Sequence, residues 1–116
     1  MALPRRAMKK DVFPETQNTW IGQRLREGKE GLAEINRHVM NVYAFPLRVY
    51  YHGTPHRWLG EADDVIQGYF ADRLAREDFF KEWLKSGLRL RRWLINGFGF
   101  YLKELKKKRR RERVSD

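Results

Sequence analysis

Cysteine is absent from the 116-residue sequence, which excludes disulfide bonds, thiolate metal ligands and a cysteine nucleophile. Long apolar runs are also absent, because no uninterrupted stretch approaches the roughly 18 residues of a membrane-spanning helix. The N-terminus, MALPRRAMKK, carries basic residues but lacks the apolar segment of an export signal. We therefore expect a cytoplasmic protein that does not bind a membrane.

Residue groupings that support catalysis or metal binding are scarce. His52 and His56 are four residues apart, but a glycine and a proline lie between them, so a shared helical face is not expected. Asp63 and Asp64 are adjacent and point to different sides of a helix, which makes them a poor acid–base pair. We expect no catalytic residue, no metal and no cofactor, and hence a protein that acts by binding and is not an enzyme.

The charge of the chain is unevenly distributed. The segment KELKKKRRRER, from Lys103 to Arg113, contains eight basic and two acidic residues, a net charge of +6. The rest of the chain carries only the remaining +4 of the formal net charge of +10. Such a basic stripe attracts phosphate groups or anionic lipid, and a solvated, partly disordered tail is the alternative interpretation.

The spacing of apolar residues predicts an all-α fold, a compact bundle of about five helices. Residues 1–15 form a flexible lead-in, residues 16–105 the helical domain, and residues 106–116 a basic tail or helix extension. Pro46 is expected to interrupt or restart the second helix. The expected helices cover residues 16–28, starting at Thr16 or Asn18, and residues 31–52, 61–75, 76–87 and 88–113.

The segment EADDVIQGYF, residues 61–70, combines an acidic start with an apolar face at helical spacing. Carboxylates in the first turn of a helix are favoured by the helix dipole, which explains part of the acidic cluster. The dipole does not explain Gln67 or Arg73, which the spacing places on the outward side. This helix is therefore a candidate for binding a partner.

The last predicted helix interleaves basic and aromatic residues, a pattern suited to neutralising phosphates and stacking on unpaired bases. Gly97 and Gly99 inside it indicate either close approach of another backbone or a weak point. Phe100 falls outside the expected buried stripe and is the best candidate for an exposed aromatic. That stripe consists of Leu94, Phe98, Tyr101, Leu102 and Leu105.

Three segments together resemble the second conserved region of bacterial sigma factors of the extracytoplasmic-function group. EADDVIQGYFADRL is similar to the acidic helix of that region, in which an acidic pair, an apolar pair, Gln and Phe follow one another. LRRWLINGFGFYLKELKKKRRRE resembles the following helix, and LAEINRHVMNVYAFPLRVYYHG the first one. The order and spacing agree over roughly residues 16 to 112.

The resemblance implies a fold and two sets of binding residues. The acidic helix of the family docks on the clamp helices of core RNA polymerase, which assigns that role to Asp63, Asp64, Gln67, Phe70 and Arg73. The last helix and the loop before it bind the non-template strand of the minus-ten promoter element. This role falls to Lys85, Arg89, Arg92, Asn96, Phe100, Lys103, Lys106, Lys107 and Arg110. For Phe70, a place in the core is an equal alternative.

The sequence also departs from the family. Relatives often carry Asn or His where Phe100 stands, which favours stacking over hydrogen-bonded readout of a base. The second domain, which reads the minus-thirty-five element, is missing. Targeting is therefore expected from a separate DNA-binding partner, unless the chain is an isolated domain, and an anti-sigma factor is a further candidate partner. The alternative function is a general basic nucleic-acid-binding protein that needs no polymerase.

Overall fold

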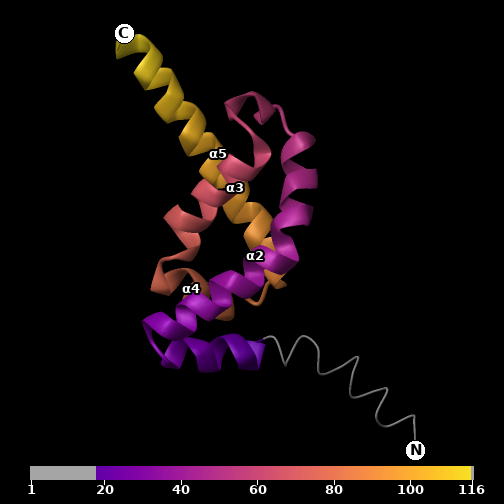
Figure 1. The fold of residues 1–116 in the computed structure, drawn as a ribbon, viewed down its shortest axis with the longest axis vertical. Coiled ribbons are helices and arrows are strands. Elements are labelled where there is room, and N and C mark those ends of the chain that lie inside the picture. The colour runs from indigo at the N-terminus through magenta and orange to yellow at the C-terminus, as the bar shows by residue number, and fades with distance from the viewer. Residues whose placement is uncertain (1–17, 116) are drawn as a thin grey trace, which may run out of the picture.

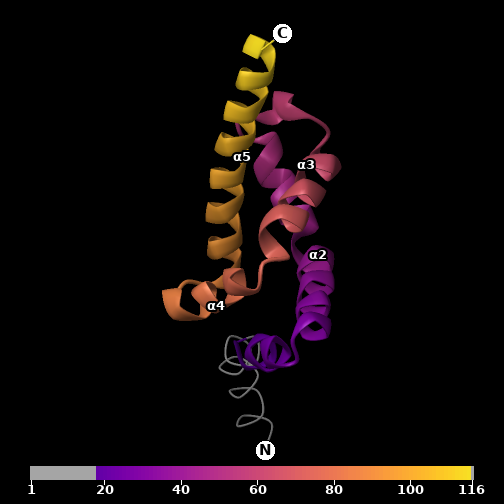
Figure 2. The same ribbon diagram turned by 90° about the vertical axis from the view of Figure 1, so that its left-hand side faces the viewer.

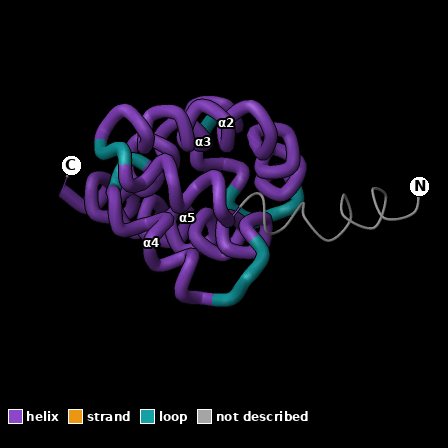
Figure 3. Tube along the Cα trace, turned by 90° about the horizontal axis from the view of Figure 1, so that it is seen from below, coloured by secondary structure: helices purple, strands orange, loops and turns teal. Residues whose placement is uncertain are grey.

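The computed structural model describes residues 18–115, and for these residues the all-α prediction is confirmed (Figure 1). A helix over residues 18–26 precedes α2 (Lys29–His52), α3 (Ala62–Tyr69), α4 (Glu77–Ser86) and α5 (Leu90–Ser115). A 3-10 turn, η1 (Arg57–Leu59), lies between α2 and α3, and the π-helical segment η2 (Phe70–Leu74) continues α3. Short loops join these elements, and no strand occurs in the described part (Figure 3). The expected lead-in, residues 1–15, and a helix start at Thr16 lie outside it.

α2 runs unbroken through Pro46, so the predicted interruption at this residue is wrong. Proline has no N–H to bond the carbonyl four residues earlier, and its ring tends to kink a helix. The turns that follow are held by the core, because Leu47 and Tyr51 beyond the proline are buried. Burial of these two side chains maintains the helix where local propensity alone would end it.

α3 and η2 together form one helical segment that matches the predicted helix over residues 61–75. The turn widens at its C-terminal end, where the Ala75 N–H donates to the Phe70 carbonyl oxygen at 3.2 Å. This bond, which spans five residues, is the mark of a π-helix. The residues that the segment buries are Ala62, Val65, Ile66, Tyr69, Phe70 and Leu74.

α5 is the longest helix, with 26 residues, and it includes the whole basic segment (Figure 2). Residues 106–113 continue α5 as a helix, which agrees with the helix extension that was one of the two expected alternatives. α4 ends where predicted, at Gly87, whose φ of 75° is the left-handed conformation that glycine adopts readily. Of the expected α5 stripe, Leu94, Phe98 and Leu102 are buried, and the other two residues are half-buried.

Two tyrosine–glycine contacts set the approach of α3 and α5. The Tyr69 hydroxyl donates to the Leu94 carbonyl oxygen at 2.8 Å, and a Cβ atom at Gly97 would lie only 2.5 Å from that hydroxyl. In the reverse direction, a Cβ atom at Gly68 would lie 2.5 Å from the Tyr101 hydroxyl. Gly97 in α5 therefore makes room for a side chain, which is neither the close backbone approach nor the weak point that were the expected alternatives.

Alkaline pH is expected to destabilise this fold, because burial raises the pKa of Tyr51, Tyr69 and Tyr101 above 10.0. In the unfolded chain these hydroxyls lose their protons near pH 10, whereas the folded state keeps them. The unfolded state then binds fewer protons, so the free energy of unfolding falls as the pH rises past about 10. Urea denaturation between about pH 8 and pH 11 measures this slope. Tyr69→Phe should flatten it, and an equally steep slope in that variant would contradict the assignment.

Candidate functional site

The polar side chains of α3 are of two kinds: one is paired with another helix, and two have no partner in the described part of the chain. Asp63 accepts two hydrogen bonds from the Arg48 guanidinium of α2, at 3.1 Å from Nε and 2.8 Å from Nη2. Asp64 and Gln67 are exposed, and neither side chain has a hydrogen bond or ion pair to another described residue. They are three residues apart and therefore lie on one side of the helix. This pair, the Asp64–Gln67 surface, is open to a partner.

Phe70 is not part of this surface, and of its two expected places, on the polymerase side or in the core, the structure has the core. Its side chain is only 4% exposed and stacks on Tyr69, with the ring centroids 6.0 Å apart. Tyr69 and Phe70 follow the buried Val65 and Ile66 by four residues, so ordinary helical spacing places both rings on the core side. The alternative of a core position is thus confirmed.

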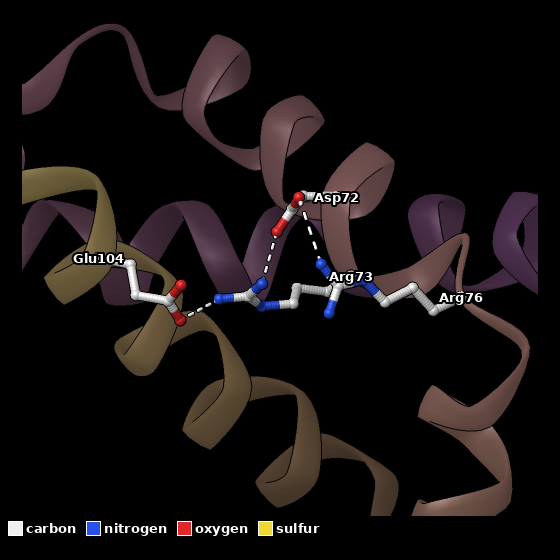
Figure 4. Close-up of polar contacts among 4 residues, drawn as sticks. All are labelled: Asp72, Arg73, Arg76 and Glu104. Carbon is white, nitrogen blue, oxygen red and sulfur yellow. Dashed lines mark hydrogen bonds and ion pairs between the residues drawn. The ribbon is translucent and has the colours of Figure 1, made fainter. Parts of the chain in front are cut away.

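Arg73, also predicted to bind polymerase, is engaged by its own chain. Its guanidinium forms ion pairs with Glu104 of α5 and with Asp72, the latter at 2.6 Å (Figure 4). It also lies over the Tyr101 ring, 5.8 Å from the centroid. A side chain held by three partners is a link between η2 and α5, so a free outward position for Arg73 is not found.

α5 presents a continuous exposed face on the side away from the core. Its members recur at spacings of three and four, and all were predicted to contact DNA: Arg92, Asn96, Phe100, Lys103, Lys107 and Arg110. Phe100 is 65% exposed, which confirms its predicted exposure, and the Lys103 ammonium lies 5.8 Å from its ring centroid. An exposed ring beside cations suits a base stacked over a phosphate backbone. We call these six residues the α5 face.

The other predicted DNA residues lie at different places. Lys106 is half-buried on the side of Leu102, so it does not belong to the α5 face. Arg89 immediately precedes α5, and Lys85 lies in the last turn of α4; both are exposed. The loop between them is fixed by Trp83, whose indole N–H donates to a loop carbonyl at 2.8 Å.

Sequence reasoning missed Arg48 and Trp58. Arg48 holds Asp63, and nothing in the local pattern of α2 indicates a partner 15 residues away. Trp58 lies in η1, is 49% exposed and contacts the guanidinium of Arg113 near the end of α5. An exposed tryptophan next to an arginine in a loop marked by glycine and proline was the available signal.

Within the described residues, no group of three or more His, Asp or Glu side chains could hold a metal ion. The groups whose pKa is clearly raised are tyrosines that pack in the core or at its edge. The hydroxyls of Tyr51 and Tyr69 donate to backbone carbonyl oxygens, which is a structural role. No helix of the described part is sufficiently long and apolar to cross a membrane.

No protein-family model, curated protein or solved structure matches the chain. The Asp64–Gln67 surface offers a carboxylate and an amide, groups that bind basic and polar side chains. The α5 face offers cations, an amide and an exposed ring, groups that bind phosphates and bases.

Proposed function

We propose that the protein is a sigma-like transcription initiation factor that binds core RNA polymerase through α3 and promoter DNA through α5. The observation that carries this proposal is the separation of two unlike surfaces on helices that pack together. α3 and α5 bury their apolar sides against each other, with Tyr69 bonded to the Leu94 carbonyl. Their exposed sides are then distinct, and one protein and one nucleic acid can be bound at once.

On the protein side, Asp64 and Gln67 would meet the clamp helices of the largest polymerase subunits. Exposed polar contacts of this kind set orientation and association rate more than raw affinity. The ion pair between Arg48 and Asp63 fixes the first turn of α3 against α2, so the neighbouring Asp64 is presented without reorganisation. Preorganisation lowers the entropy lost when the partner binds.

On the DNA side, the α5 face would bind the non-template strand of the minus-ten element. Extruding a base from the duplex costs a few kcal/mol, and stacking on an aromatic side chain such as Phe100 returns about 1–3 kcal/mol per base. One exposed ring therefore cannot open the duplex alone. Melting would depend on polymerase, and the free protein would bind promoter DNA weakly.

In this proposal the protein acts in the cytoplasm, where core polymerase and promoter DNA meet. Neither of the two surfaces is proposed to read the minus-thirty-five element. A separate DNA-targeting partner would then select the promoter, and an anti-sigma factor would regulate access to the polymerase-binding surface.

The double variant Asp64→Ala, Gln67→Ala is expected to lower affinity for core RNA polymerase about tenfold or more, since both open groups of the surface are lost. Both residues are exposed, so the circular dichroism spectrum should remain that of the parent protein. Co-purification with core polymerase, quantified by titration, measures the effect.

Asp78→Ala is the matched control, because Asp78 is an exposed acidic residue in the first turn of α4. It should bind polymerase within about twofold of the parent protein. If the parent protein fails to bind polymerase, or the double variant binds equally well, the proposal is wrong. Retained, polymerase-independent binding to nucleic acid would then support the general nucleic-acid-binding alternative.

A further inference from the structure

We propose that the C-terminal part of α5, residues 103–113, and the η1 turn form one site for the phosphate backbone of duplex DNA. In this site Trp58 is a positioning residue that fixes the direction of the basic helix. The inference rests on the proposed function in taking DNA as the ligand. It adds a duplex contact, separate from base stacking at Phe100, that requires no polymerase.

The η1 turn is anchored to the core. Leu59 is 1% exposed, and the Tyr51 hydroxyl of α2 donates to the Gly60 carbonyl oxygen at 2.7 Å. Gly60 has a φ of 153°, a conformation that side chains rarely adopt, so the turn has a specific backbone shape. A turn fixed on both sides can hold another element in place.

The η1 turn also contacts the basic C-terminal end of α5. Arg109 Nη1 donates to the Leu59 carbonyl oxygen at 2.9 Å, across 50 residues of sequence. One turn further along, the Arg113 guanidinium lies over the Trp58 ring, 5.8 Å from its centroid. Figures 1 and 2 both show the η1 turn beside the C-terminal half of α5, which extends past the other helices.

Without these contacts the helical conformation of the basic segment would be only marginally stable. Residues 106–113 contain no apolar side chain, and like charges repeat at the i,i+4 spacing, as in Lys106 with Arg110. Such pairs destabilise a helix, and an isolated helical end of this length frays in water. A protein that needed only a positive tail would need no contacts to fix it. The two contacts from η1 indicate that the direction of the helix matters.

The charge and length of this site suit duplex DNA. Lys103, Lys107 and Arg110 share the exposed side and span about 10 Å along the helix, roughly three base-pair steps. Of the two acidic residues in this segment, Glu104 is paired with Arg73, and the spacing of Glu112 places it on the other side of the helix. The exposed side is thus close to purely cationic, the condition under which phosphate binding releases counterions.

The test uses the full chain without polymerase and a fluorescently labelled DNA hairpin duplex of about 20 base pairs, titrated by anisotropy at several salt concentrations. The parent protein should bind weakly, with a Kd in the micromolar range that rises steeply with salt. Trp58→Ala should weaken binding about fivefold at low salt and reduce the salt slope by about one, although it removes no charge. Trp58→Phe, which keeps a ring, should restore most of the affinity.

Phe45→Ala is the matched control, because Phe45 is a 66% exposed aromatic residue on α2. It should bind the duplex within about twofold of the parent protein. The triple variant Lys103→Gln, Lys107→Gln, Arg110→Gln should reduce the salt slope by about three, one for each phosphate contact. An unchanged affinity in Trp58→Ala, or an unchanged slope in the triple variant, would overturn the site. Equal binding to a duplex RNA hairpin would overturn the assignment to DNA.

Different results would contradict the duplex-DNA site and the proposed polymerase-binding function. Loss of duplex binding in Trp58→Ala with intact polymerase binding supports this site, whatever the fate of the Asp64–Gln67 surface. The double variant Asp64→Ala, Gln67→Ala should bind the duplex like the parent protein, because the acidic helix does not take part in this contact.

Discussion

Replacing Gly31 with alanine is expected to detach the N-terminal helix and lower the free energy of unfolding by about 3 kcal/mol. A Cβ atom at Gly31 would overlap the backbone carbonyl oxygen of Arg24, where the helix over residues 18–26 crosses the start of α2. A backbone atom cannot swing aside as a side-chain end can. The helix must therefore move, and it takes Ile21 and Leu25 out of the core. Burial of each such side chain contributes about 1.5–3 kcal/mol.

Urea denaturation of Gly31→Ala measures both the free energy of unfolding and the m-value, which should fall because less apolar surface is buried. Gly22→Ala is the matched control in the same region. Gly22 lies inside the helix over residues 18–26, and a Cβ atom there would meet nothing within 4 Å. This variant should gain about 0.5–1 kcal/mol from helix propensity. Equal behaviour of the two variants would show that the crossing is not tight.

Comparison of Gly28 with Gly31 and Gly22 shows which requirements for glycine can be predicted from the sequence. Gly28 was predicted as a helix stop because a left-handed residue there is a local requirement, and its φ is 73°. Nothing local distinguishes Gly31 from Gly22, since the requirement at Gly31 comes from a second helix. The point at which two helices cross is decided by packing between them, and a single sequence does not show it.

The same distinction applies to the candidate surfaces. Gln67 and Phe100 were assigned to exposed positions from helical periodicity, and they are exposed, because periodicity encodes which side of a helix faces the core. For Phe70 the resemblance implied a polymerase contact and the periodicity a core position, and the periodicity is confirmed, because Phe70 follows the buried Ile66 by four residues. Arg73 was misassigned because its partner, Glu104, is 31 residues away on α5. Element type and register could be predicted; irregular turns and long-range pairing could not.

The contact between Tyr69 and Gly97 predicts the second large effect on the free energy of unfolding. A double-mutant cycle isolates this effect. Gly97→Ala places a methyl group 2.5 Å from the Tyr69 hydroxyl. Tyr69 is completely buried and bonded to Leu94, so the ring has no room to move away. Overpacking of this kind costs about 1–3 kcal/mol, and we expect a net loss of about 2 kcal/mol in the free energy of unfolding.

Tyr69→Phe removes the hydroxyl and its hydrogen bond, with an expected loss of about 1 kcal/mol. In that background the nearest atom to the new methyl group is the ring carbon, at an ordinary 3.5 Å. Gly97→Ala should then become stabilising by about 1 kcal/mol, because alanine is the better helix former. The double variant is thus expected to be about as stable as the parent protein, a coupling free energy of about 3 kcal/mol between the two positions.

Gly99→Ala provides the control for helix propensity alone, because its Cβ atom would lie 3.4 Å from the hydroxyl of the half-buried Tyr50. That side chain can shift by a few tenths of an ångström, so the variant should be neutral or slightly stabilising. Thermal and urea denaturation of the four members of the cycle measure the coupling. Additive effects of Tyr69→Phe and Gly97→Ala would mean that α3 and α5 are not locked by this contact. α5 would then lack the fixed position, relative to α3, on which the proposed simultaneous binding of two partners depends.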